Sequence, residues 1–248
     1  MKRLLGLLFA TAWITGPAQG ADNDATPILD KAIAALGGEA KLAKAAVTSW
    51  KSSGTIVFNE NEAPIKTRSI IEGFERQKSD FEFEINGNSV VGVTVFDGAK
   101  GWRKIGDMVQ DLDGEALAVT RQNTYLQAIH LSILPLKKKP FEVEAAPDEK
   151  VGDKMASVVT AKGPDGKPFT LYFDKETGLP LKLTATIKNF QGEDVKQEST
   201  FSEYKDFDGI KRATKVDILW DGKPFLKSDQ SDFKTMEKAE PGTFAEPK

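Results

Sequence analysis

The spacing of apolar and polar positions changes at Thr48, after which a period of two continues over most of the chain. Every second position there carries either a large apolar side chain or a small one: Trp50, Ser52, Gly54, Ile56 and Phe58. The intervening positions Lys51, Ser53 and Thr55 are polar. Because successive side chains of a β-strand point to opposite faces of its sheet, this pattern predicts a strand with one face toward water.

Residues 80–85 show the same alternation most clearly. Phe81, Phe83 and Ile85 share one face, and three carboxylates separate them in the sequence. A strand with one wet face is typical of antiparallel pairing. Pairs that supply the positive φ angles of tight hairpins recur along the chain: Asn86-Gly87, Asp97-Gly98, Asp165-Gly166, Asp208-Gly209 and Asp221-Gly222. We therefore expect an antiparallel meander of about eleven strands.

A helical period replaces the alternation at the start of the sheet and again near its middle. The first helix is expected to have Thr26 as its cap, Pro27 as its first residue and Gly37-Gly38 at its end. A shorter helical segment is expected over 39–47. Within 113–135, Leu126, Ile129 and Ile133 recur at helical spacing. No linker or internal repeat divides the sequence, so residues 21–248 are expected to form a single domain.

The first twenty residues have the features of a secretory signal peptide. Lys2 and Arg3 precede an apolar stretch that is too short to span a bilayer, and Ala18-Gln19-Gly20 follows as a small-x-small cleavage motif. Cleavage is expected after Gly20. The chain contains no cysteine, so the exported protein would carry neither a lipidated N-terminal cysteine nor a disulfide. These features predict a periplasmic protein with no stable membrane anchor.

Charged residues give little indication of function. Without Lys2 and Arg3, 32 basic residues face 37 acidic ones, and both signs are interleaved along the expected strands. Nucleic-acid binding would require a basic stripe, whereas the only run of lysines is 137–139, beside Pro140. No nucleic-acid partner is expected.

Residues able to carry catalysis are scarce. His130 is the only histidine and lies in an apolar stretch, which favours a place at the edge of the core, and a zinc site would need several His or Cys ligands. Asp80, Glu82 and Glu84 would lie about 6–7 Å apart along one strand face, a spacing open to a hydrolase or to calcium. Their alternation with aromatic residues favours an ordinary charged outer face. We expect no enzyme activity, catalytic residue, metal or cofactor.

Apolar residues on the expected inner face form the remaining candidate site. Two helices are too few to cover one face of so large a sheet, and a curved, partly covered sheet favours an apolar cavity for a small hydrophobic ligand. In the hairpin 171–183, four apolar side chains are expected to turn to one side. The complete set of expected cavity residues is Trp50, Ile56, Phe58, Phe81, Phe83, Ile85, Phe96, Trp102, Leu126, Ile129, Ile133, Leu171, Phe173, Leu181 and Leu183.

The order of several short motifs resembles the LolA/LolB-like superfamily, the outer-membrane lipoprotein-sorting-protein-like group. These motifs run over most of the mature chain: ALGG (35–38), TVFDGAKGW (94–102), ILPL (133–136), YFDKETGLPLKL (172–183), FSEYKDFDGIKRATKVDI (201–218) and FAEP (244–247). The resemblance implies a half-open β-barrel with an apolar interior and a lid of helices, in the periplasm. It implies no catalytic residues.

The sequence thus predicts an α+β, mainly antiparallel β-protein: one curved half-open barrel whose concave face is covered by helices. Its predicted function is that of a periplasmic carrier or binding protein for a lipid, a lipoprotein acyl chain or another apolar ligand. The alternative is a periplasmic sensor or interaction module that recognises a protein, such as a component of a membrane complex, through the same groove or a sheet edge. The cargo and the oligomeric state stay open.

Overall fold

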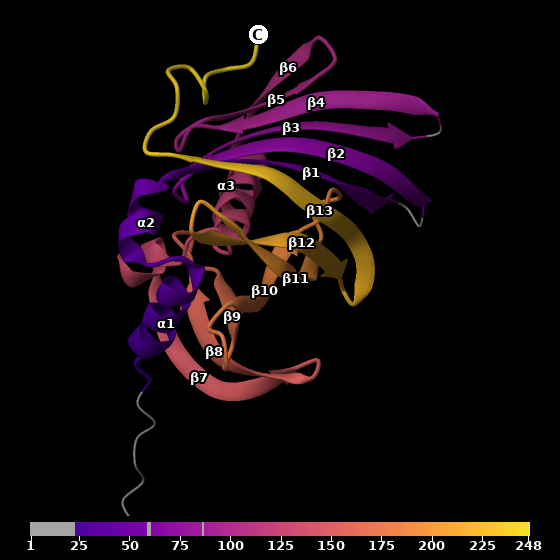
Figure 1. The fold of residues 1–248 in the computed structure, drawn as a ribbon. Helices are drawn as coiled ribbons and strands as arrows, with labels where there is room; N and C mark the ends of the chain where they lie inside the picture. Colours follow the sequence, from indigo (N-terminus) through magenta and orange to yellow (C-terminus); the bar gives the residue numbers. More distant parts are fainter. Residues whose placement is uncertain (1–22, 59–60, 86) are drawn as a thin grey trace, which may run out of the picture.

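The computed structural model describes residues 23–58, 61–85 and 87–248, in which the strands form one antiparallel sheet (Figure 1). The predicted signal peptide and its cleavage after Gly20 lie outside these residues. The thirteen strands of the described part are β1 (Val47–Phe58), β2 (Asn61–Glu72), β3 (Arg76–Ile85), β4 (Asn88–Phe96), β5 (Gly101–Ile105), β6 (Met108–Leu112), β7 (Glu142–Val151), β8 (Lys154–Lys162), β9 (Pro168–Asp174), β10 (Pro180–Lys188), β11 (Asp194–Phe207), β12 (Ile210–Trp220) and β13 (Lys223–Met236).

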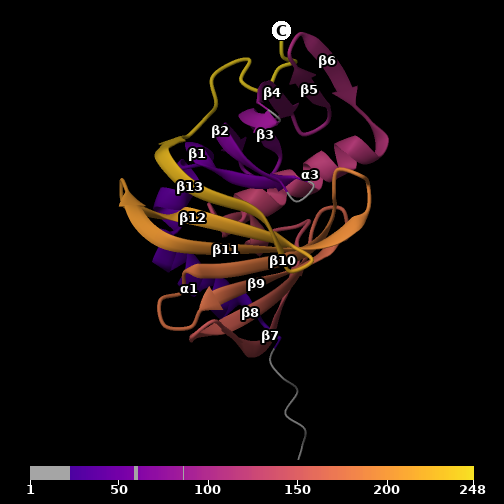
Figure 2. The ribbon, with the colours of Figure 1, turned by 90° about the vertical axis from the view of Figure 1, so that its right-hand side faces the viewer.

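Two meanders, β1–β6 and β7–β13, join through the pairing of the first strand with the last. The strand order is β6-β5-β4-β3-β2-β1-β13-β12-β11-β10-β9-β8-β7. The resulting sheet curves strongly, and the two meanders form its opposite wings (Figure 2). Its two edge strands, β6 and β7, are consecutive strands in the chain. The segment that connects them therefore has to cross between the wings, and it contains the longest helix of the part that the structure describes.

Gly54 allows close approach at the seam between β1 and β13. It faces Ser228 in the register of the two strands. A Cβ atom at this position would lie 1.8 Å from the main-chain oxygen of Lys227. Any larger residue would push the strands apart, so this glycine is required by the pairing that joins the two wings.

Within the described residues the helices are α1 (Thr26–Leu36), α2 (Glu39–Lys44) and α3 (Gly114–Ala128), with a short 3-10 helix, η1, at Leu134–Lys137. In α1 the buried face, which includes Leu29 and Ile33, packs into the main core. Figure 1 shows α1 and α2 beside one end of the curved sheet and α3 between the wings. Thr26 is the first residue of α1 rather than its cap: Ala25 holds the cap position, and the Thr26 N–H donates to the Asp24 carboxylate at 2.9 Å.

The predicted antiparallel β architecture is correct in kind but not in two details. The described residues contain thirteen strands instead of about eleven, and the helices cover only part of the concave face. Edge strands explain the difference in number. Four of the five side chains of β6 are exposed, and β7 is mostly exposed as well, so neither carries a strong apolar alternation.

Two of the predicted hairpin turns have the expected backbone geometry. Asp208 and Gly209 have φ angles of 56° and 77°, and Asp221 and Gly222 have 48° and 77°. Two successive positive φ angles match the twist of antiparallel strands in a tight hairpin. These turns connect β11 to β12 and β12 to β13, which form the centre of the sheet.

Candidate functional site

A cavity of about 540 Å³ lies beside α3, between β1–β3 on one side and β10–β13 on the other. This volume is within the range of about 300–1,000 Å³ that is usual for small-molecule sites. Glu115, Val119, Leu126 and His130 line it from the α3 segment. At 1.5 Å per helical residue, this row extends over roughly 20 Å. The cavity is therefore an elongated channel that follows the helix.

One end of the channel is closed and the other opens to solvent. Trp50 on β1 and Val216 on β12 are buried at the closed end, where the His130 side chain is only 4% exposed. Exposure increases along the same walls, so that Trp220 is half-buried and Glu115 is exposed. A long ligand would consequently enter past the start of α3 and the hairpins that end β10 and β12.

Three aromatic residues gather at the open end. The rings of Trp220 and Phe225 stack with centroids 3.4 Å apart and an interplanar angle of 8°. Phe190, which is 59% exposed, lies 5.5 Å from the Trp220 ring. All three line the channel. They give its entrance an apolar rim on the side of β10–β13.

Many polar side chains of the wall are paired with one another. Ser52 bonds Thr67 across β1 and β2 at 2.6 Å, and Ser69 bonds Ser79 across β2 and β3 at 3.0 Å. Similar pairs join Gln197 to Ser199 at 3.1 Å, Trp220 to Gln197 at 3.2 Å, and Gln77 to the wall residue Gln127 at 2.8 Å. An apolar chain can pass such groups at low desolvation cost, because their hydrogen bonds are already made within the protein.

The closed end differs in its polar groups. Among the described residues, neither ring nitrogen of His130 has a hydrogen-bond partner. Within the same residues, the Oε1 atom of Gln230 has none either. Both residues line the channel, and the His130 ring stacks on Phe201 with centroids 4.7 Å apart. Burial lowers the pKa of His130 to about 4, and the charge of Arg212 acts in the same direction. Gln230 and the Gln127 main chain lie close enough to oppose this pKa shift in part, without completing a hydrogen bond.

Arg212 on β12 is a fully buried cation near the closed end. Its guanidinium donates to the main-chain oxygen of Leu131 and, at 3.3 Å, to Oγ1 of Thr48. Burial lowers the Arg212 pKa to about 10, although Tyr204 opposes the shift. These contacts fasten the turn after α3 to β1 and β12. The charge does not line the channel.

The structure places the predicted cavity residues in several environments. Trp50, Ile56 and Leu126 line the channel. Phe81 and Phe83 stack on each other 5.8 Å apart, half-buried on β3, and they are cross-strand neighbours of the channel residues Thr67 and Ile65. Phe58 and Ile85 belong to β1 and β3, but their side chains lie outside the described part. Six others are buried away from the channel: Phe96, Ile129, Ile133, Leu171, Phe173 and Leu183.

Trp102 and Leu181 lie on the opposite face of the sheet, which corrects their expected positions. Trp102 is paired across β4 and β5 with Val95 and packs with it against Phe244 of the C-terminal segment. Leu181 sits at a bulge in β10, between Pro180 and Lys182, and packs on the outer cluster around Tyr172. The bulge adds a residue to one strand only. Leu181 and Leu183 therefore face opposite ways despite their spacing of two.

Several channel residues were not among the predicted ones. They include the buried Phe201, Val216 and Ser228 as well as the half-buried Ile218 and Gln230. Alternation along β11 and β12 is visible in the sequence and could have identified Phe201, Val216 and Ile218. Serines and glutamines alternate with aromatic residues elsewhere in the channel wall and do not resemble an apolar face. The sequence therefore did not identify residues such as Ser228 and Gln230.

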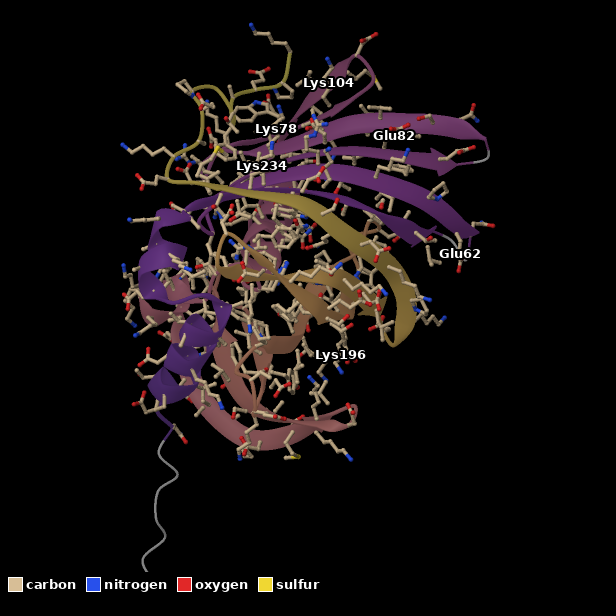
Figure 3. The ribbon with its side chains drawn as sticks, viewed as in Figure 1. Glu62, Lys78, Glu82, Lys104, Lys196 and Lys234 are labelled. Carbon is tan, nitrogen blue, oxygen red and sulfur yellow. The ribbon has the colours of Figure 1, made fainter. Side chains whose placement is uncertain are left out.

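The three carboxylates of β3 do not face the channel. Ser79 lines it, and Asp80, Glu82 and Glu84 point to the opposite, outer face by strand alternation. Figure 3 labels Glu82, and it labels Lys78 and Lys234, which line an outer groove near the C-terminal segment. No group of three or more His, Cys, Asp or Glu side chains able to hold a metal ion occurs in the part of the chain that the structure describes. The hydrolase alternative thus gains no support from this geometry.

No helix among the described residues is both long enough and apolar enough to cross a membrane. No protein-family model matches the sequence, and a search of curated proteins found no relative.

Solved structures show the fold. A DUF1329 family protein from Desulfovibrio piger matches with a TM-score of 0.57 at 13% identity, covering 90% of this chain and 97% of its own. A LolA superfamily protein from Nitrosomonas europaea matches with a TM-score of 0.56 at 14% identity, and the match covers 89% of this chain and 97% of that protein. A putative outer membrane lipoprotein-sorting protein domain from Vibrio parahaemolyticus matches with a TM-score of 0.58 at 16% identity, and the match covers 90% of this chain and 97% of that domain. This chain has a LolA-like fold.

Proposed function

We propose that this protein is a periplasmic carrier or binding protein that shelters an acyl chain or a similar apolar ligand in the channel along α3. The observation that carries the proposal is the channel itself: about 540 Å³, closed at Trp50 and open past the aromatic rim at Trp220. The predicted signal peptide supports the periplasmic location. The LolA-like fold supports a lipid or a lipoprotein acyl chain as the ligand. The protein would act by reversible burial, with no bond made or broken.

The energetics of burial suit an acyl chain. Each methylene that leaves water contributes about 0.8 kcal/mol, so a chain of ~14 methylenes gains on the order of 11 kcal/mol when fully buried. Part of this gain is offset by the loss of translational and chain freedom on binding. The remaining free energy corresponds to tight but reversible binding. A channel open at one end would also let the cargo leave without unfolding of the sheet.

Ligand binding can be tested by native mass spectrometry of gently purified protein and by titration with the apolar probe N-phenyl-1-naphthylamine. Val119 is half-buried in the channel wall near its open end. Val119→Trp should fill the entrance and weaken probe binding by about tenfold, which corresponds to about 1.4 kcal/mol. Val91→Trp is the matched control, because Val91 is 57% exposed on β4 and does not line the channel.

The control variant should bind the probe as the wild type does. Absence of any bound lipid mass, together with no probe binding at micromolar concentration, would reject the carrier function. Equal weakening by both variants would show that the probe binds outside the channel.

A protein partner is the second candidate, and the exposed edge strand β6 favours it. Met108 is 76% exposed and Val109 is 39% exposed on this strand. A free strand edge can pair with an extended segment of another chain through main-chain hydrogen bonds. A Val109→Pro variant would remove one main-chain donor from this edge. Loss of a stoichiometric cross-linked partner in this variant, with normal probe binding, would support the second candidate.

A further inference from the structure

The closed end of the channel holds polar groups that the protein leaves unpaired. His130 is 4% exposed and Gln230 is half-buried, and both side chains line the channel. Among the described residues, both ring nitrogens of His130 and Oε1 of Gln230 lack hydrogen-bond partners. Buried polar groups are nearly always paired. A cluster of unpaired ones at the end of a binding channel therefore indicates the place of a ligand's polar group.

The rest of the channel makes this cluster distinctive. Ser52, Thr67, Ser69 and Ser79 are hydrogen-bonded to one another in pairs across neighbouring strands. The Gln197 amide is likewise engaged, with Ser199 and Trp220. A hydrocarbon chain passing these groups leaves no hydrogen bond unmade. The same chain reaching the closed end with a terminal methyl group would leave His130 and Gln230 dry and unpaired.

The available atoms define the chemistry of the missing partner. A neutral imidazole offers one N–H donor and one acceptor nitrogen, and the Gln230 oxygen is an acceptor. A matching ligand group must both donate and accept, as a hydroxyl or an amide does. A carboxylate only accepts, so it would oppose the Gln230 oxygen. The nearby cation, Arg212, is already bonded to Leu131 and Thr48 and does not line the channel.

We propose that the channel binds single-chain amphiphiles with their polar end inward, and that His130 and Gln230 hydrogen-bond an uncharged hydroxyl or amide group there. The inference rests on the proposed binding function and specifies its substrate class. The acyl or alkyl tail then lies along α3 toward the aromatic rim at Trp220. The polar group of the ligand, rather than chain length alone, sets specificity.

The experiment measures displacement of N-phenyl-1-naphthylamine at pH 7.5 by 1-dodecanol, 1-chlorododecane and dodecanoate. The chloride has the same chain without the hydroxyl group, so the ratio of the two dissociation constants isolates the polar contact. His130→Phe keeps the ring stack on Phe201 and removes both nitrogens, and Gln230→Met removes the amide. Each variant should raise the dissociation constant of dodecanol relative to that of the chloride by about 5- to 10-fold. Because both residues line the channel, the dissociation constant of the probe is measured separately for each variant and used in its displacement analysis.

Thr200→Ala is the control, because Thr200 is a hydrogen-bonded polar residue of β11 that does not line the channel, and it should leave the ratio unchanged. His130 also provides a readout in the wild type, since it is the only histidine. Its Cε1–H resonance should shift on addition of dodecanol and stay in place with the chloride.

An unchanged ratio in both variants, with normal probe binding, would overturn the inward polar end and leave the binding function intact. Tighter binding of dodecanoate than of dodecanol, lost in His130→Phe, would also overturn it, in favour of an anion site. Failure of the wild type to bind any probe or ligand would overturn the binding function itself, and with it this inference.

Discussion

Lowering the pH from 7 to 5 should destabilise this protein through a single side chain. His130 is its only histidine, and burial holds its pKa at about 4 in the folded state. In the unfolded chain the imidazole has an ordinary pKa of about 6.5. The unfolded state therefore binds a proton that the folded state does not accept. The stability that comes from keeping His130 neutral is therefore present in full above pH 6.5, and it is lost progressively as the pH falls toward 4.

The size of the effect follows from the two pKa values. One pKa unit corresponds to about 1.4 kcal/mol, so the complete loss is about 3 kcal/mol, and about 2 kcal/mol of it occurs between pH 7 and pH 5. Carboxyl groups of model peptides have pKa values near 4, below this interval. Few other side chains change charge within it.

Urea unfolding followed by tryptophan fluorescence at pH 7, 6 and 5 measures the loss, in protein without a histidine tag. The His130→Phe variant keeps the ring stack on Phe201 and lacks the titrating group. Its free energy of unfolding should vary by less than about 0.5 kcal/mol over the same interval. The Cε1–H resonance of the folded wild type should not titrate above pH 5. A titration midpoint near 6.5, or an equal loss of stability in the variant, would refute the assignment.

Two further substitutions test how the sheet is held together. Gly54→Ala should reduce stability by about 1–3 kcal/mol or more, because the added methyl group would meet the Lys227 main-chain oxygen at the seam of β1 and β13. Urea unfolding measures this loss. The control is Ser53→Ala at the exposed neighbouring position, which should be nearly neutral. Asp174→Ala should reduce stability by about 1–3 kcal/mol, because the buried carboxylate accepts hydrogen bonds from the Glu176 and Thr177 N–H groups at 2.9 and 3.1 Å and from Lys154 at 2.7 Å. Asp174→Asn should restore part of that loss. Equal stability of the alanine variant and the wild type would contradict this role.

Local features were readable from the sequence. The alternation around Phe81 and Phe83 predicted a strand with a charged outer face, and the Asp-Gly pairs at 208 and 221 predicted tight hairpins that the structure contains. The first helix lies where Pro27 and Gly37 indicated. Each of these features depends on neighbours within a few residues, so the backbone preferences of a short segment are sufficient to specify it.

The sequence by itself therefore determined the antiparallel strands, the turns and the scarcity of catalytic groups. Only the tertiary structure decided which apolar face became core, channel or outer surface. Trp102 faces away from the channel because the C-terminal segment brings Phe244 to the outer side, and Leu181 does so because of a bulge. His130 became the end of a channel because β13 returns to pair with β1 and sets Gln230 beside it. Contacts between residues so distant in the chain depend on how the whole sheet curves and closes, which no local pattern records.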